Sequence, residues 1–208
     1  MPDPRSPALD EVVGYGADLD AGTLLDAYRA GLFPMRVGRD KILAWFSPDP
    51  RSVIPLGGLH ISRTLQRSLR KFEIRIDTDF TGVMRACAEN RDDGNWIDDD
   101  FVSAYERLFE LGWAHSIEVW QGSDLVGGLY GVSIGGLFAG ESMFHRVTDA
   151  SKAAMVATEE RLRAGGGSLF DVQWSTPHLE SMGVVEIDRD DYLRRLESAI
   201  NAPVVYWE

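Results

Sequence analysis

The chain has 208 residues, which is long enough to bury a hydrophobic core in one sizeable domain, with or without a small second one. Hydrophobic residues make up 44% of the chain and charged residues 26%, values that exclude a disordered or fibrous protein. The 21 Lys and Arg side chains against 33 Asp and Glu give a net charge of −12, which by itself argues against a protein that coats nucleic acid or an anionic membrane.

The first third of the chain reads as short elements separated by loops. Residues 1–13 are rich in Pro and Asp, and we expect them to be poorly ordered. Apolar spacing predicts a helix over residues 23–30, and repeated Pro and Gly predict a loop over residues 45–60. A helix over residues 62–70 and a half-buried strand over residues 72–76 are expected to follow.

The remaining elements alternate more regularly. Acidic residues followed by apolar residues at helical spacing predict a helix over residues 98–111. The elements expected after it are strands over 115–120, 125–131 and 137–144, a helix over 151–164, a strand over 168–173, a short helical piece near 178–182 and a helix over 190–200. A helix and an antiparallel meander followed by helix, strand and helix indicate an α+β fold.

Compartment and metal content can be addressed from a few residue types. The single cysteine, Cys87, excludes a disulfide within the chain and fits a reducing compartment. No run of about 18 apolar residues exists, and the N-terminus lacks the pattern of a secretion signal, so we expect a cytoplasmic protein with no membrane contact. The four histidines are not at metal-site spacings, so neither a metal nor any other cofactor is expected.

Three polar residues stand inside segments that otherwise read as buried strands. Glu141 must be paired or hydrogen-bonded there, either in an ion pair that holds the sheet or in a substrate site. Asp171 and Gln173 are two residues apart, so a strand places both on one face, with the carboxylate accepting from the side-chain amide. The pair serves either the structure or a site.

Apolar residues of the meander and the next helix could form the core or line a pocket beside Glu141. These residues are Leu129, Phe138, Met143, Phe144 and Met155. A pocket of this kind suits a ligand that is partly apolar and partly cationic, as an amino acid is.

Charge is unevenly distributed along the chain. Residues 51–75 contain six basic side chains against one acidic, a net charge of +5, which leaves −17 for the rest. The basic residues include Arg51, Arg63, Arg67, Arg70 and Lys71. Helical spacing places several of them in one stripe, which is either a solvated helix face or a local phosphate-binding patch.

Short motifs recur in a fixed order along the chain. The most specific are S-P-D-P-R at residues 47–51 and G-E-S-M-F at residues 140–144. The others are residues 27–34, 45–46, 59–63, 96–97, 114–120, 125–131, 138–139, 150–152, 171–173 and 178–179. Together they span roughly residues 14–197, and in this order they resemble the bacterial leucyl/phenylalanyl-tRNA–protein transferases.

The resemblance implies a reaction and an architecture. Such an enzyme takes Leu or Phe from aminoacyl-tRNA, with Met as a further candidate donor in this chain, and joins it to the N-terminus of a protein that begins with Arg or Lys, which marks that protein for degradation. The implied architecture is a small N-terminal domain over residues 1–60 and an acetyltransferase (GNAT)-like domain over residues 61–208, with a mixed sheet and flanking helices. A monomer is expected.

The resemblance also assigns residues. Asp171 and Gln173 match the catalytic D-x-Q pair, and Glu141 matches an active-site glutamate. Residues that match the pocket for the Leu or Phe side chain are Leu129, Phe138, Met143 and Met155. Trp96 matches a tryptophan near the terminal adenosine of the tRNA, whereas Met35 stands where relatives often have Trp.

Two other functions remain open from sequence. An acetyl-CoA-dependent N-acetyltransferase on the same fold would need a glycine-rich turn for the pyrophosphate, but residues 145–151 contain no glycine. The other is an inactive tRNA- or degron-binding module, against which the intact Asp171, Gln173 and Glu141 argue.

Overall fold

A computed structural model describes residues 1–6, 11–89 and 96–207 of the chain. Part of the segment expected to be poorly ordered, residues 7–10, therefore lies outside the described residues. Residues 12 and 13 do not follow that expectation, because strand β1 (Val12–Tyr15) begins there and pairs with β3 (Ile42–Phe46). Backbone pairing with a distant strand orders this segment, and local composition cannot reveal such a partner.

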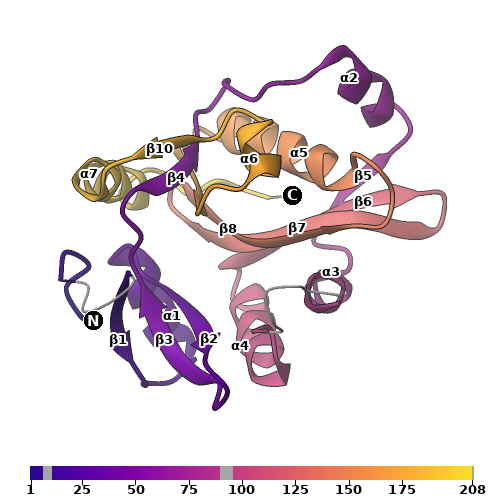
Figure 1. The fold of residues 1–208 in the computed structure, drawn as a ribbon. Coiled ribbons are helices and arrows are strands. Elements are labelled where there is room, and N and C mark those ends of the chain that lie inside the picture. Colours follow the sequence, from indigo (N-terminus) through magenta and orange to yellow (C-terminus); the bar gives the residue numbers. More distant parts are fainter. Residues whose placement is uncertain (7–10, 90–95, 208) are drawn as a thin grey trace.

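The N-terminal part of the chain forms a small antiparallel sheet with one helix beside it (Figure 1). The sheet order is β1-β3-β2, with β2 over Phe33–Val37. The predicted first helix is present as α1 (Ala21–Arg29), and its buried side includes Leu24 and Tyr28. Gly31 ends it with φ +82°, and an added Cβ there would lie 2.8 Å from the Leu193 side chain.

The rest of the chain builds a seven-stranded mixed sheet in the order β10-β4-β9-β8-β7-β6-β5. Its strands are β4 (Arg51–Ile54), β5 (Glu73–Ile76), β6 (Ala114–Gln121), β7 (Asp124–Ile134), β8 (Leu137–His145), β9 (Leu169–Gln173) and β10 (Val185–Ile187). β8 and β9 pair in parallel, and the other described pairs are antiparallel. This confirms the predicted α+β fold with a mixed sheet and flanking helices.

Helices cover both faces of the large sheet. On one side lie α2 (Arg63–Leu69) and α5 (Ala150–Ala164), and on the other lie α3 (Phe80–Ala88) and α4 (Asp99–Glu110) (Figure 1). The remaining helices are α6 (Pro177–Glu180) and α7 (Arg189–Ile200). The buried hydrophobic residues form two clusters. One lies around α3, α4 and the small sheet, and the other lies around α5.

The prediction of a continuous loop over residues 45–60 was wrong. Residues 51–54 form β4, which lies inside the large sheet between β9 and β10. All four of its residues are buried, and pairing on both sides overrides the nearby prolines and glycines. Sequence reasoning also missed β10 and α3, although Phe80, Val83, Met84 and Cys87 recur at helical spacing in α3.

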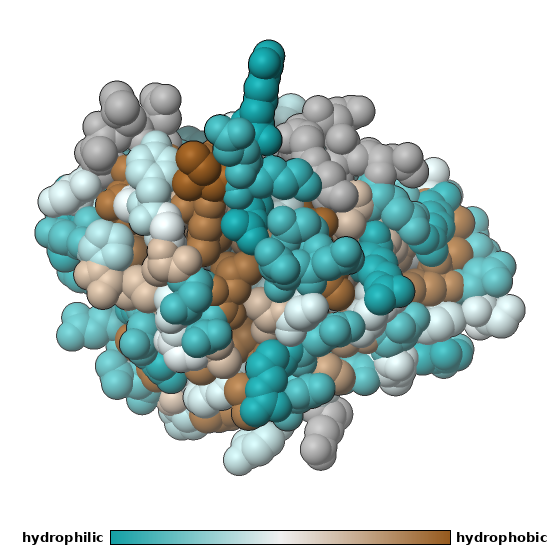
Figure 2. Space-filling model, turned by 90° about the horizontal axis from the view of Figure 1, so that it is seen from below, coloured by the Kyte–Doolittle hydropathy of each residue, from teal (hydrophilic) through white to brown (hydrophobic). Residues whose placement is uncertain are grey.

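Two surface properties accompany this fold. Hydrophilic side chains cover most of the face seen from below, and exposed apolar areas lie between them (Figure 2). Among the described residues, no helix is both long and apolar enough to cross a membrane.

Candidate active site

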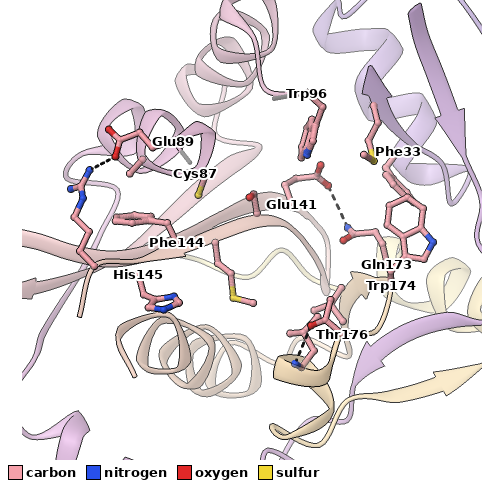
Figure 3. Close-up of a pocket in the computed structure, with 17 residues that line it drawn as sticks. Phe33, Cys87, Glu89, Trp96, Glu141, Phe144, His145, Gln173, Trp174 and Thr176 are labelled. Carbon is pink, nitrogen blue, oxygen red and sulfur yellow. Dashed lines mark hydrogen bonds and ion pairs between the residues drawn. The ribbon is translucent and has the colours of Figure 1, made fainter. Parts of the chain in front are cut away.

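A cavity of about 650 Å³ opens where the parallel strands β8 and β9 stop pairing. Their pairing runs from Leu137 with Leu169 to Ala139 with Asp171. Just beyond these pairs, Glu141 on β8 and Gln173 on β9 line the cavity, together with residues of β2 and α3 (Figure 3). The sheet topology therefore brings together the two side chains that the sequence selected from separate strands.

Asp171 does not line the cavity and forms a fully buried ion pair with Arg51. The two carboxylate oxygens of Asp171 accept hydrogen bonds from Arg51, with Nε to Oδ1 at 2.9 Å and Nη2 to Oδ2 at 2.6 Å. Tyr192 on α7 donates its hydroxyl to Oδ2 at 2.9 Å. Such a bidentate pair, with a further donor on the carboxylate, satisfies a buried charge that would otherwise be very unfavourable.

The placement of Arg51 corrects its predicted role in tRNA binding. The side chain is 1% exposed and lies between the rings of Phe33 and Tyr192, at 4.8 and 4.4 Å from their centroids. Burial lowers the pKa of Arg51, but the charge of Asp171 and its hydrogen bonds outweigh this and raise the pKa above its ordinary value. Arg51 is thus a structural counter-ion of Asp171 and cannot reach a phosphate.

Gln173 ends β9 in a backbone conformation that favours glycine. Its φ is +61°, in the left-handed region, and its backbone N–H donates to Oδ1 of Asp171 at 3.0 Å. The side-chain amide points elsewhere and donates to Oε1 of Glu141 at 3.4 Å. The predicted bond between the Asp171 carboxylate and the Gln173 side-chain amide is therefore wrong, because the turn at Gln173 presents its backbone N–H to Asp171 instead.

Glu141 is held by a hydrogen-bonded pair of buried tyrosines. Tyr105 on α4 donates to Oε2 of Glu141 at 3.3 Å and also hydrogen-bonds the hydroxyl of Tyr28 on α1. Burial raises the pKa of Glu141 to about 7, and the charge of Asp171 adds to this, although hydrogen bonds from the tyrosines and the charge of Arg51 oppose it. Near neutral pH this carboxyl group therefore exists in both protonation states.

An apolar side pocket of about 90 Å³ adjoins Glu141 and Gln173. Three of the predicted pocket residues, Leu129, Met143 and Met155, line it, with Phe170, Val172 and Leu179 from other elements. Phe138 is not among the lining residues and packs in the core against Phe170 and Trp207, at 5.7 and 4.7 Å between ring centroids. Phe138 therefore supports the wall from behind, because its position on β8 turns it toward the core.

Comparison with known proteins identifies the family. The sequence pattern of the family described as "Leucyl/phenylalanyl-tRNA protein transferase" matches residues 53–197, and that of its N-terminal domain matches residues 17–49. The chain belongs to this family. It is an aminoacyltransferase whose family uses aminoacyl-tRNA and protein substrates, and the acetyl-CoA alternative is not favoured.

Similar proteins come from several bacteria. Proteins named leucyl/phenylalanyl-tRNA–protein transferase from Alkalilimnicola ehrlichii and Thiobacillus denitrificans are each 48% identical, over 96% and 92% of this chain and 83% and 86% of their own. That of Sulfurimonas denitrificans is 41% identical over the whole chain and 92% of its own. Among solved structures, L-PGS from Bacillus licheniformis matches with a TM-score of 0.43 and 11% identity, over 76% of this chain and 52% of that one.

One end of the cavity of this transferase is lined by aromatic side chains (Figure 3). Trp96, which is 7% exposed, packs edge-on against Phe101 on α4 at 5.4 Å between ring centroids. Phe33 and Trp174 pack edge-to-face with 4.8 Å between their ring centroids. Trp174 donates its indole N–H to the Glu11 carboxylate at 2.7 Å. Met35 also lines the cavity, two residues after Phe33 on β2.

The basic stripe of the transferase lies on α2, away from the cavity lining. Ser62 caps this helix by accepting from the backbone N–H of Leu65, and Leu65 is its buried residue. Arg63, Arg67 and Arg70 are exposed, as is Lys71 just after the helix. The structure places these four predicted residues together on the surface and removes Arg51 from the set.

The junction into α5 lacks the features of a pyrophosphate site. The residue before the helix is Asp149, with φ +69° and no side-chain cap bond, and its carboxylate accepts from the hydroxyl of Ser68 at 2.7 Å. A carboxylate at this position repels a phosphate, whereas a pyrophosphate site presents unobstructed backbone N–H groups. Among the described ranges, no group of three or more His, Cys, Asp or Glu is placed to hold a metal ion.

Sequence reasoning missed the tyrosines that support the site. Tyr28, Tyr105 and Tyr192 lie on helix faces where an aromatic residue reads as ordinary core. Their roles depend on hydroxyl partners that are at least 21 residues away in the chain. No periodicity along the sequence carries that information.

Proposed function

We propose that this transferase moves Leu or Phe, and also Met, from aminoacyl-tRNA to the α-amino group of proteins that begin with Arg or Lys, and that it does so in the cytoplasm, marking them for degradation. The observation that carries the proposal is the arrangement of Gln173. Its amide nitrogen is engaged by Glu141 at the cavity wall, which leaves its carbonyl oxygen to accept a hydrogen bond from a ligand.

The chemistry needs positioning more than a strong base. The amine nitrogen attacks the ester carbonyl, the bond from that carbon to the ribose oxygen breaks, and the proton lost by nitrogen ends on the ribose oxygen. A protein α-amino group has a pKa of about 7.7–8.0, so a useful fraction is neutral at pH 7. Gln173 orients this amine through its carbonyl oxygen, and Asp171 is a positioning residue that holds the Gln173 backbone.

The remaining contacts divide among three surfaces. The side pocket lined by Leu129, Met143 and Met155 takes the Leu or Phe side chain, since its lining is apolar. Trp96 contacts the terminal adenosine, and the exposed basic residues of α2 bind tRNA phosphates. Because these basic residues are few, the contact with tRNA is short and centred on the acceptor end.

We propose that the chain has a small N-terminal domain and a large C-terminal domain. We also expect it to be a monomer. The separate small sheet, which ends at Phe46, supports a division into two domains. The boundary lies between Phe46 and Arg51 rather than at residue 60, because β4 belongs to the large sheet.

The test is aminoacyl transfer by the full chain. Radiolabelled Leu-, Phe- and Met-tRNA are each incubated with the protein and a peptide that begins with Arg, and the same peptide with an acetylated N-terminus is the matched control. We expect label on the free peptide alone. Absence of transfer from all three donors, with acetyl transfer from acetyl-CoA, would establish the acetyltransferase instead, and tight tRNA binding without turnover would indicate the inactive binding module.

A further inference from the structure

Three basic side chains come together beside the apolar side pocket. They are His145 at the end of β8, Lys152 in the first turn of α5 and His178 on α6, and we call them the His–Lys cluster. His145 lines the cavity and lies on the side of β8 opposite to Phe144 (Figure 3). This is the side of the sheet that α5 covers, because Phe144 packs against the cluster around α3 and Met143 against the cluster around α5.

The positions of Lys152 and His178 in their helices connect them to the side pocket. Lys152 is three residues before Met155 on α5, so the two side chains share one face of this helix. His178 directly precedes Leu179 on α6. Met155 and Leu179 both line the side pocket. The His–Lys cluster therefore lies next to the pocket for which we propose the amino acid side chain of the donor.

The polar atoms of the His–Lys cluster are poorly satisfied within the chain. Nε2 of His178 is buried and has no hydrogen-bond partner in the part of the chain that the structure describes. Lys152 is half-buried, and residues 1–6, 11–89 and 96–207 provide no ion pair for it. Buried polar groups are normally hydrogen-bonded, so these two side chains indicate a ligand.

The charges of the cluster show which kind of ligand suits it. Burial lowers the pKa of His178, the positive charges of Lys152 and His145 lower it further, and the negative charge of Asp149 opposes them. An anion bound between Lys152 and the two imidazoles would relieve this repulsion and supply the missing hydrogen-bond acceptor. The ligand is therefore an anion with several acceptor oxygens, such as a phosphate.

Asp149 lies between the His–Lys cluster and the basic stripe of α2. Its carboxylate accepts a hydrogen bond from the hydroxyl of Ser68 on α2 at 2.7 Å, which joins the start of α5 to α2. Arg67 and Arg70, on either side of Ser68 in the sequence, are exposed. Asp149 keeps an anion away from the end of α5 itself, but the cluster and the stripe are adjacent. Together they form a basic path from the surface of α2 to the cavity.

A tRNA whose amino acid occupies the side pocket would bring a phosphate to the cluster. The ester joins the amino acid to the terminal ribose, and the last phosphate of the chain is attached to the 5′ oxygen of the same ribose. Lys152 is about 5 Å from Met155 along the axis of α5, which is comparable to the length of one ribose. The long lysine side chain can cover the remaining distance.

We infer that His145, Lys152 and His178 bind the last phosphodiester of the tRNA, beside the side pocket that takes its amino acid. This inference rests on the proposed function and deepens it. Lys152 supplies a full positive charge, and the imidazole N–H groups supply further donors. Phosphate contacts position a nucleic acid without reading its sequence, which suits an enzyme that accepts more than one aminoacyl-tRNA.

The test uses two minimal donors that differ in whether they carry this phosphodiester. One is phenylalanyl-adenosine, and the other is the dinucleotide cytidylyl-adenosine with the same phenylalanyl ester. In transfer to a peptide that begins with Arg, we expect the wild-type KM to be about tenfold lower for the dinucleotide. Lys152→Gln should reduce this preference to about twofold. The matched control is Lys41→Gln, which removes the same charge from an exposed turn between β2 and β3 and should retain the tenfold preference.

His178→Leu separates a ligand contact from a structural role. Because Nε2 of His178 has no partner within the described residues, this change should not lower the midpoint of thermal unfolding. The preference for the dinucleotide should nevertheless fall about threefold. A lower midpoint with the full wild-type preference would show that His178 is structural and would overturn its place in the site.

Calorimetry gives a readout that does not depend on transfer. The probe is cytidylyl-adenosine that carries phenylalanine through an amide in place of the ester. Weaker binding of this probe by Lys152→Gln than by Lys41→Gln supports the site even if no aminoacyl transfer occurs and the proposed function fails. Transfer by the wild-type protein, with the same dinucleotide preference in Lys152→Gln and Lys41→Gln, overturns the inference and leaves the proposed function intact.

Discussion

Asp171 accepts a hydrogen bond from the backbone N–H of Gln173 at 3.0 Å, so the D-x-Q pair acts through the main chain. The consequence is that Asp171 holds the left-handed turn that aims the Gln173 side chain at Glu141. Asp171 is in turn fixed by Arg51 and Tyr192. The Gln173 side chain, for which we propose a role in positioning the amine, is thus held by a buried charged network of Arg51, Asp171 and Tyr192 that does not line the cavity.

Removing one member of the buried ion pair should be strongly destabilising. Asp171→Asn leaves the Arg51 guanidinium buried without its counter-ion, so the free energy of unfolding should fall by about 3–5 kcal/mol. The double variant Arg51→Met/Asp171→Asn removes both charges and should recover much of that loss. Urea unfolding measures both, with Glu110→Gln as an exposed-pair control expected to change stability by less than about 1 kcal/mol. An Asp171→Asn protein as stable as the control would contradict this account.

The backbone at Gln173 separates a stability effect from an activity effect. Gln173→Gly relieves the left-handed strain that Gln173→Ala retains, so the glycine variant should be more stable by about 1 kcal/mol. Both variants lack the side-chain carbonyl, so kcat for aminoacyl transfer should fall about a hundredfold in each. Thermal unfolding and single-turnover transfer check the two parts, and undiminished turnover in either variant would remove Gln173 from the mechanism.

The raised pKa of Glu141 predicts how stability depends on pH. The folded-state pKa of about 7 exceeds the ordinary value of 4.5, so the folded state binds more protons and wild-type stability falls as pH rises from about 4.5 to 7. Glu141→Gln lacks this titration. Between pH 5 and pH 8 the unfolding free energy of wild type should drop by about 2 kcal/mol relative to Glu141→Gln. Parallel pH profiles of the two proteins in urea unfolding would show that the carboxyl group is not perturbed.

The side pocket should set the choice of amino acid. Met143→Ala enlarges a pocket that Met143 lines, so the ratio of kcat/KM for Phe-tRNA to that for Leu-tRNA should rise about tenfold. Met182→Ala is the matched control, because Met182 is buried in the same hydrophobic cluster and does not line the pocket. Equal ratios in both variants would place the aminoacyl side chain elsewhere.

The basic stripe on α2 should govern the salt dependence of tRNA binding. Arg63→Glu with Arg67→Glu should weaken tRNA binding. The slope of log affinity against log salt concentration should become less steep, as expected when about two phosphate contacts are lost. Arg194→Glu with Arg195→Glu on α7 makes the same change in net charge and is the control. If the two double variants lose affinity equally, the effect is one of overall charge, and the stripe is only a solvated helix face.

Local patterns in the sequence were sufficient for most of the elements and for the enzyme class. Helices α2, α4, α5 and α7 and strands β6 to β9 follow from apolar periodicity, acidic first turns and turn residues. The motifs around Glu141, Asp171 and Gln173 indicated the transferase family, and the comparisons confirmed it. These signals are local, because each depends on residues within a few positions of one another.

The tertiary structure alone decided which partners the buried side chains of the candidate site have. Arg51 belongs to a basic stretch of sequence, yet it pairs with a carboxylate 120 residues away because β4 lies beside β9 in the sheet. The packing of helix α4 against the large sheet likewise brings the Tyr105 hydroxyl to Glu141, and the tertiary structure turns Phe138 into the core. The sequence by itself determined most of the helices and strands between residues 98 and 200 and the class of reaction. The partners of each buried charge depend on which strands become neighbours, and that is decided by packing over the whole chain.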